Sequence, residues 1–289
     1  MENPIKWSGS KRLLANQIIS HFPEGKTGKF YELFCGGCSI TLELILKYPD
    51  KAREYENIIC VDNNEDLMHL WNYIKRTPNL LIGGYERLWK DFKQRQEETI
   101  EGHRKFYFNY IRNEFNSKLH SNLTNSIYFL FLLRTSFSGL VRYNSSGVYN
   151  SSCHFTRPGI HPDKMKKIII KASELLNEYN VLFLCGDYKD FIPDYNDFVF
   201  MDPPYSSVGN SKGKKSMYHG GINTNELIEY CNNLKCDYAL TFDGDRGENK
   251  ANKISLNGVN IVNLEKKNSS YSRLNGKQVE VEEIMYIKK

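Results

Sequence analysis

The sequence lacks the features that mark membrane and secreted proteins. It contains no run of about 18 apolar residues, so we expect no transmembrane helix. Its first residues, MENPIKWSGSKRLL, contain no apolar segment of a secretory signal peptide. The seven cysteines are odd in number and scattered through apolar stretches, which favours reduced thiols over a disulfide framework. We therefore expect a cytoplasmic protein.

Two nucleotide-binding fingerprints, G-x-G-x-x-G and G-x-x-x-x-G-K-[ST], are also missing. Their absence argues against a dinucleotide or a nucleoside triphosphate as ligand. The net charge is only +5, which permits a polyanionic partner without requiring one. Many of the 19 tyrosines and 16 phenylalanines lie beside Arg, Lys or Asn, as in RKFYFNYIRNEFNSK. Such interleaving suits stacking on nucleic-acid bases, although aromatic side chains more often belong to a protein core.

The order of strand and helix patterns predicts an α/β fold with a parallel sheet. A short strand over residues 29–34 is followed by the glycine turn CGGCSI, a helical segment and a strand, NIICVD, that ends at Asp62. This βαβ unit makes its two strands parallel. The following stretch is helical, aromatic and polar, and the strand pattern then returns. We therefore predict a catalytic domain of residues 1–75 and 160–289, interrupted by a mainly helical insertion of residues 76–159.

The glycine turn is the first stretch with a chemical implication. Gly36 and Gly37 lie where a strand gives way to a helix, and the missing Cβ atoms let a ligand approach the backbone closely. Asp62 ends the next strand, where a carboxylate can accept both hydroxyls of a ribose. The combination favours a nucleoside-bearing cofactor, whereas either feature alone also fits a bare turn or a surface acid. Cys35 and Cys38 form a C-x-x-C pair, but no second Cys/His pair has matching spacing, which favours a structural turn over a metal or redox site.

The second such stretch is FVFMDPPYSS, residues 198–207. Its four apolar residues predict a buried strand, and the strand must end at the prolines because proline cannot donate to a sheet ladder. Ligands of open α/β sheets bind beyond the carboxyl ends of the strands, and Asp202 lies at such an end. The carboxylate, the turn carbonyls and the flat ring of Tyr205 are what the amino group of a planar base requires. The alternative is a turn with a buried tyrosine, but D-P-P-Y after an apolar strand favours a functional site.

These stretches together resemble a known family. The segments KWSGSK, FYELFCGGCSI, IICVDNNEDLMHLWNYIK, RTSFSGLVRYNSSGVYN, CGDYKDF and FMDPPY occur in the order typical of the Dam-like (D12 class, alpha group) DNA adenine-N6 methyltransferases. The resemblance covers nearly the whole chain. It implies a Rossmann-like, S-adenosylmethionine-dependent methyltransferase fold, with residues 76–159 as an inserted target-recognition domain that carries a DNA-contacting hairpin.

The resemblance also implies roles for individual residues, each of which is an expectation. The catalytic motif that would hold a flipped-out adenine comprises Asp202, Pro203, Pro204 and Tyr205. Binding of S-adenosylmethionine, which leaves as S-adenosylhomocysteine, would involve Trp7, Lys11, Phe34, Gly36, Asp62, Asp187 and Asp202. DNA contacts would come from Ser138, Arg142, Asn144 and Lys214. Arg142 is a candidate for bidentate contact to a guanine, and the alternatives are a phosphate contact or a salt bridge. No metal is expected in the reaction.

Some positions depart from the family pattern. Members that act on GATC usually have Asn in place of Ser138, and F-N-V-P in place of YNSS at residues 149–152. Both positions belong to the expected hairpin, so the recognition sequence stays open. We expect an enzyme that methylates adenine N6 at specific sites in double-stranded DNA, in a bacterial or phage-infected cell. It would serve a restriction–modification system with a cognate endonuclease, or act as an orphan or phage enzyme. The alternatives are cytosine-N4 or RNA adenine methylation, and a catalytically inactive DNA-binding protein.

Overall fold

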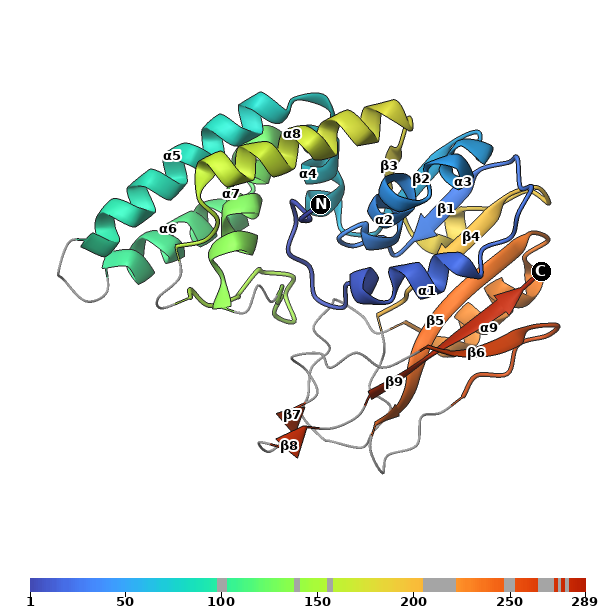
Figure 1. Cartoon of the computed structure of the whole chain (residues 1–289). Helices are drawn as coiled ribbons and strands as arrows, with labels where there is room; N and C mark the ends of the chain where they lie inside the picture. Colours follow the sequence, from blue (N-terminus) through green and yellow to red (C-terminus); the bar gives the residue numbers. More distant parts are fainter. Residues whose placement is uncertain are drawn as a thin grey trace. The chain divides into compact units, whose positions relative to one another are not determined.

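The computed structural model describes residues 1–97, 103–137, 141–154, 158–204, 222–246, 253–264, 273–274, 277–278 and 281–289. The chain forms two compact units, whose elements are labelled in Figure 1. The helical unit contains Met1–Ser10 and Asn64–Cys185, and the sheet unit contains Lys11–Asn63 and the described residues from Gly186 onward.

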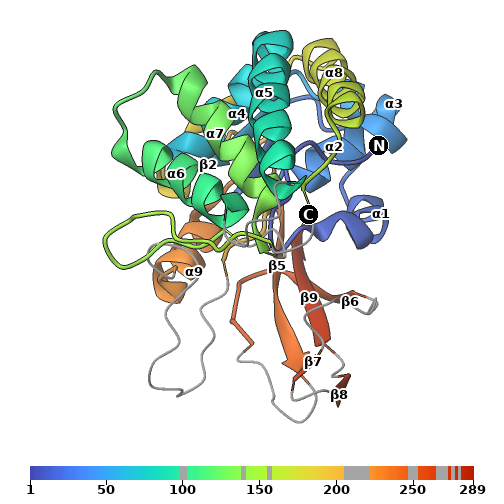
Figure 2. The same ribbon diagram turned by 90° about the vertical axis from the view of Figure 1, so that its left-hand side faces the viewer.

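The sheet unit is built on a mixed β-sheet. Within this unit the strand order is β2-β1-β4-β5-β9-β6, and Figure 2 shows β9 between β5 and β6. The bounds are β1 Phe30–Leu33, β2 Ile58–Asp62, β4 Phe198–Met201, β5 Asp237–Arg246, β6 Asn260–Leu264 and β9 Val281–Lys288. β1 runs parallel to β2 and β4, and β4 runs parallel to β5, whereas β9 is antiparallel to both of its neighbours. A short antiparallel pair joins β7 (Arg273–Leu274) and β8 (Lys277–Gln278). The mixed architecture confirms the expected α/β, Rossmann-like fold class.

The register of the parallel strands brings their carboxyl ends level. Leu33 of β1 pairs with both Val61 of β2 and Met201 of β4, and Met201 pairs with Leu240 of β5. All residues of β1 and β4 are buried, as the apolar runs predicted. The residues that follow these strands, Phe34 and Asp202 among them, therefore emerge at the same edge of the sheet.

Short helices flank this sheet. They are the 3₁₀ helix η1 (Lys11–Leu13), α1 (Ala15–Ser20), α2 (Ser39–Lys47), α3 (Pro49–Glu54), η3 (Tyr188–Asp190) and α9 (Thr224–Asn233). The core beside β1 and β4 is aromatic: the ring centroid of Phe22 lies 4.6 Å from that of Phe198. Phe30 stacks on the same Phe198 ring at 6.0 Å. This packing fixes α1 against the strands that carry the candidate site.

The helical unit packs around one apolar helix. Its elements are α4 (Glu65–Arg76), α5 (Pro78–Glu97), α6 (His103–Ser117), α7 (Asn122–Thr135), α8 (Pro162–Glu178) and β3 (Leu182–Cys185). α7, NLTNSIYFLFLLRT, is apolar around most of its circumference and contacts α4, α5 and α6, as expected for a helix in a core. Phe129 of α7 stacks on Phe115 of α6 at 5.1 Å. Among the described helices, none is both long and apolar enough to cross a membrane.

The aromatic residues of α6 divide between the core and the surface. Phe108 and Phe115 are fully buried, whereas Phe106 and Tyr110 are 72% and 50% exposed. Many of the interleaved aromatic side chains are thus core residues. Residues 64–75 belong to the same compact unit as the helices that follow them. The boundaries of the compact units therefore differ from those of the predicted domains. The target-recognition domain of residues 76–159 stays a prediction.

Candidate functional site

The glycine turn and Asp62 are joined by hydrogen bonds at the carboxyl edge of β1 and β2. The amide of Cys35 donates to the carbonyl of Val61 at 2.8 Å. The amide of Gly36 donates to Oδ2 of Asp62 at 3.0 Å. The carbonyl of Asp62 in turn accepts from the amide of Gly186 at 3.2 Å. The structure therefore brings together Gly36 and Asp62, which the sequence had placed in one nucleoside-binding pattern.

The backbone of this turn is strained. Phe34 and Cys38 have φ angles of 59° and 48°, and Gly36 has a φ of 46°. Non-glycine residues in the left-handed region cost about 1–3 kcal/mol each and persist where the surrounding structure holds them. Such strain is typical of sites where backbone closely approaches a ligand.

Glu32 stabilises the turn by binding the start of the helix that follows it. It lies in β1 and is 3% exposed, and its carboxyl oxygens accept from the amides of Thr41 at 2.8 Å and Ile40 at 3.4 Å. These amides belong to the first turn of α2, which otherwise has no side-chain cap. Burial raises the pKa of Glu32 to about 8. Sequence reasoning missed this residue, although an acid inside the apolar strand FYELF was a visible signal.

The cysteines of the turn are buried beneath it. Cys35 and Cys38 are reduced thiols, and burial raises the pKa of each well above the ordinary value. Cys60 of β2 lies next to them in the core, with its Sγ 3.3 Å from Oγ1 of Thr41. Within the described ranges, no group of three or more His, Cys, Asp or Glu residues is arranged to hold a metal ion. The structural interpretation of the C-x-x-C pair stays a prediction.

Asp202 follows the end of β4, and its carboxylate contacts Thr241 and Lys11. Oδ1 of Asp202 accepts from Oγ1 of Thr241 at 2.8 Å, and Nζ of Lys11 lies 3.0 Å from the same oxygen. The Lys11 ammonium also lies 3.6 Å from Oε1 of Glu283. The side chain of Lys11 is 5% exposed, whereas those of Asp202 and Glu283 are 20% and 25% exposed. A buried cation thus pairs with two partly exposed carboxylates beside the proline turn.

The other residues predicted for the cofactor occupy varied positions. Phe34 is half-buried, and its ring lies 5.0 Å from that of Tyr188. Asp187 is exposed and caps η3 by accepting from the amide of Lys189 at 3.0 Å. Trp7 belongs to the helical unit, where it packs edge-on against Phe129. The contacts of these residues with a cofactor stay predictions.

The residues predicted to contact DNA lie partly in an antiparallel hairpin, residues 141–154. Arg142 is exposed, and its guanidinium makes no hydrogen bond or ion pair with any residue that the structure describes. Oδ1 of Asn144 accepts from the amides of Ser146 and Val148, each at 2.9 Å, so this side chain shapes the tip of the hairpin. Ser138, Lys214 and the catalytic candidate Tyr205 lie outside the described residues.

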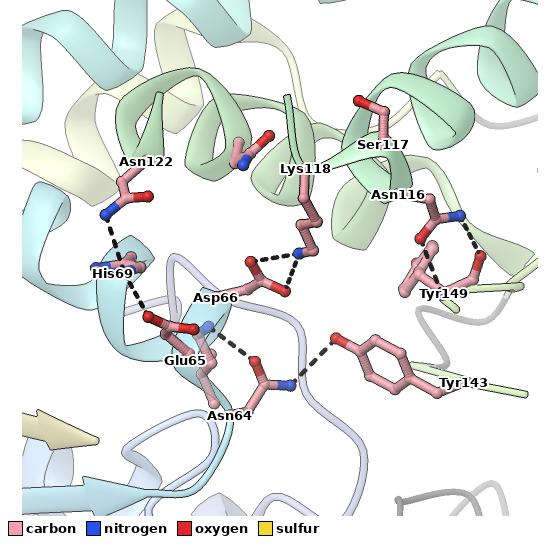
Figure 3. Close-up of polar contacts among 12 residues, drawn as sticks. Asn64, Glu65, Asp66, His69, Asn116, Ser117, Lys118, Asn122, Tyr143 and Tyr149 are labelled. Carbon is pink, nitrogen blue, oxygen red and sulfur yellow. Dashed lines mark hydrogen bonds and ion pairs between the residues drawn. The ribbon is translucent and has the colours of Figure 1, made fainter. Parts of the chain in front are cut away.

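Two asparagines support the arms of this hairpin (Figure 3). Asn116 of α6 pairs with the backbone of Tyr149: its Nδ2 donates to the carbonyl at 2.9 Å and its Oδ1 accepts from the amide at 3.0 Å. Asn64 donates to the hydroxyl oxygen of Tyr143 at 3.1 Å and also caps α4. The Tyr149 ring is buried edge-on against Phe115. Asn116 and Asn64 therefore fix the two arms of the hairpin, while Arg142 stays exposed.

Comparison with known proteins agrees with these features. A sequence profile described as D12 class N6 adenine-specific DNA methyltransferase matches residues 7–270. The Type II methyltransferase M.MjaIII of Methanocaldococcus jannaschii is 30% identical over 233 residues, which cover 78% of this chain and 76% of that protein. The DNA N-6-adenine-methyltransferase of Escherichia phage P1 is 30% identical over 211 residues, covering 72% of this chain and 24% of the phage protein. A DNA adenine methylase of Vibrio cholerae serotype O1 is 25% identical over 220 residues, covering 75% of this chain and 70% of that protein.

Proposed function

Because the chain belongs to the family of D12 class N6 adenine-specific DNA methyltransferases, we propose that it transfers a methyl group from S-adenosylmethionine to adenine N6 at specific sites in double-stranded DNA. The observation that carries this proposal is the position of Asp202. Its carboxylate follows β4 and is held by Thr241 and Lys11, and β4 ends level with β1, which leads into the glycine turn. The family match confirms the expected enzyme class, an adenine-specific DNA methyltransferase.

The residues around Asp62 fit the proposed methyl donor. The carboxylate lies at the end of β2 and is held beside the turn by Gly36, where it suits the hydroxyls of a ribose. Phe34 and Tyr188 form an aromatic pair in the same unit, which suits the faces of a nucleoside. When bound, S-adenosylmethionine supplies an electrophilic methyl group on a sulfonium. Asp62 and the backbone of the turn would bind and orient its nucleoside end.

Asp202 would activate the amino group of the target adenine. The lone pair of this nitrogen is delocalised into the ring, which makes it a poor nucleophile. Hydrogen bonds from the amino group to Asp202 and to the carbonyl of Pro203 would favour a tetrahedral and more nucleophilic nitrogen. Lys11 keeps a positive charge 3.0 Å from the carboxylate and so stabilises its negative charge. Holding the amino group in one orientation would account for a large share of the rate.

The DNA would be engaged by the hairpin of residues 141–154 and by a base-flipping step. An adenine inside a duplex cannot reach Asp202, so it must be extruded, and Tyr205 is the proposed stacking partner. Arg142 is the proposed reader of a guanine, because it is exposed on a hairpin that α6 holds in place. Ser138, Asn144 and Lys214 remain proposed DNA contacts. A restriction endonuclease acting on the same site is the proposed functional partner, since M.MjaIII is named a Type II methyltransferase.

Transfer of a labelled methyl group tests this proposal. Purified protein is incubated with S-adenosylmethionine labelled in the methyl group and with duplex DNA, and the modified base is identified after digestion. We expect label in N6-methyladenine for the wild type and for Asp50→Ala, a matched substitution at an exposed acid of α3. We expect no label for Asp202→Ala. Label in cytosine, or transfer that survives in Asp202→Ala, would contradict the proposal.

A further inference from the structure

A buried hydroxyl contacts the carboxylate of Asp202. Thr241 lies in β5 and is fully buried, and it follows Leu240, the residue that pairs with Met201 of β4. Oγ1 of Thr241 lies 2.8 Å from Oδ1 of Asp202 and 3.3 Å from the carbonyl oxygen of Met201. A hydroxyl has one hydrogen to donate, and the shorter contact, to a carboxylate, is the stronger of the two. Thr241 therefore donates mainly to Asp202.

The hydroxyl of Thr241 is buried within an otherwise apolar part of β5. Thr241 is preceded by Ala239 and Leu240, both fully buried, in a strand at the centre of the sheet. Burying a hydroxyl is unfavourable unless it is hydrogen-bonded, whereas the methyl group that valine carries at this position has no such cost. What threonine adds to this position is the hydrogen bond to the end of β4.

Thr241 and Lys11 contribute different things to the carboxylate. Lys11 provides a positive charge at the end of a long side chain, and this ammonium contacts Glu283 as well as Asp202. Thr241 reaches Asp202 from a short, β-branched side chain with few rotamers, on a strand fixed by pairing on both sides. A carboxylate rotates about a single bond, so a rigid donor on one oxygen sets the direction of the other.

We propose that Thr241 is a positioning residue for methyl transfer, whose hydroxyl orients the carboxylate of Asp202 toward the amino group of the target adenine. The inference rests on the proposed function, in which Asp202 accepts a hydrogen bond from that amino group. It follows that Thr241 acts on the rate of the bound complex and leaves the binding of DNA and of the methyl donor unchanged.

The test compares Thr241→Val, which removes the hydroxyl, with Thr241→Ser, which keeps it. We expect Thr241→Val to lower kcat by about tenfold to hundredfold, with KM for DNA and for S-adenosylmethionine within about twofold of the wild type. Thr241→Ser should restore most of the rate.

A matched control separates this role from a general effect of removing a buried hydroxyl. Thr135 is also fully buried, and its hydroxyl donates to the carbonyl of Phe131 at 2.7 Å. Thr135→Val should leave kcat unchanged. The thermal midpoint of each variant shows that it is folded at the assay temperature.

Three outcomes would overturn the inference. They are a wild-type kcat in Thr241→Val, an equally low kcat in Thr241→Ser, and a loss that appears only in KM. The role of Thr241 can be tested separately from the proposed function. If the wild type methylates adenine and Asp202→Ala does not, then an active Thr241→Val contradicts the role of Thr241 alone. A wild type without methyl transfer would overturn both.

Discussion

The ammonium of Lys11 lies 3.0 Å from Oδ1 of Asp202, and it is buried while the carboxylate is partly exposed. The resemblance to the family placed Lys11 among the residues expected to bind the cofactor, and the structure pairs its ammonium with the proposed catalytic acid and with Glu283. The amide of Lys11 also donates to Oγ of Ser39, at the start of α2. The 3₁₀ helix η1, which begins at Lys11, is therefore part of the support of Asp202.

Replacing Lys11 by methionine should lower both the rate of methyl transfer and the free energy of unfolding. The substitution leaves Asp202 and Glu283 without the cation that contacts both, so methyl transfer should fall by about hundredfold or more. The free energy of unfolding should fall by about 2–4 kcal/mol, because a mostly buried pair is broken from one side. Urea denaturation and initial rates measure the two effects. Lys90→Met, which breaks an exposed pair with Glu86, is the control and should change neither. An active and stable Lys11→Met would show that the pair has no role.

Asp62→Asn should weaken binding of the methyl donor specifically. The asparagine oxygen can still accept from the amide of Gly36, so the turn keeps its shape. A neutral amide is a weaker acceptor for ribose hydroxyls, and we expect the dissociation constant of S-adenosylmethionine to rise by about tenfold. Isothermal titration calorimetry measures it, with Asp50→Asn on α3 as the control. Unchanged affinity in Asp62→Asn would mean that the ribose is bound elsewhere.

The burial of Glu32 predicts a pH dependence of stability. Its pKa rises from about 4.5 to about 8 on folding, so the folded state binds more protons than the unfolded state between these values. Its contribution to stability is therefore fully present below pH 4.5 and is lost as the pH rises through 8. Glu32→Gln should remove this loss, because the amide stays neutral and can still accept from Thr41. Denaturation of both proteins at several pH values measures the difference. If the free energy of unfolding depends on pH equally in the wild type and in Glu32→Gln, the predicted role of Glu32 is wrong.

Asn116→Ala should relax sequence recognition. It removes both hydrogen bonds to the backbone of Tyr149, so the hairpin that carries Arg142 loses its support from α6. We expect methylation to spread to sites that differ from the main target by one base pair, with about fivefold to thirtyfold less discrimination. Sequencing of methylated DNA measures the spread. Asn113→Ala, at an exposed position of the same helix, should keep wild-type discrimination. If both variants behave alike, the support of the hairpin is not what sets specificity.

Arg142→Ala distinguishes the two ways in which this exposed side chain could contact DNA. Bidentate contact to a guanine predicts a loss of about 1–3 kcal/mol on the preferred site, with relaxed choice at one base pair. A phosphate contact predicts a uniform loss on all sequences and a smaller dependence of affinity on salt. Binding titrations with single-base-pair variants, at two salt concentrations, measure both. No effect on any DNA would exclude Arg142 from the interface.

The βαβ unit and the end of β4 could be predicted because their signals are local. Apolar runs mark β1, β2 and β4, glycines mark the turn, and prolines mark the point where β4 stops. The meeting of the glycine turn with Asp62 also followed from the sequence, since the carboxyl ends of adjacent parallel strands lie at one edge.

The remaining contacts depend on which strands become neighbours, and no local pattern encodes that. Thr241 looks like any residue of an apolar strand until the pairing of β4 with β5 places it beside Asp202. Glu283 reaches Lys11 because β9 runs antiparallel between β5 and β6, an order that periodicity does not reveal. Asn116 looked like a polar residue of an aromatic segment, and its pairing with Tyr149 depends on how α6 packs behind the hairpin.

Single-molecule sequencing of DNA from cells that express the protein shows directly whether it methylates adenine N6 at a defined site and whether Asp202 is required. It reports the modified base and its sequence context together, and Asp202→Ala expressed at the same level is the reference. We expect N6-methyladenine in one defined sequence context for the wild type, and none for Asp202→Ala. Methylated cytosine, or no modification by a folded wild-type protein, would contradict this expectation.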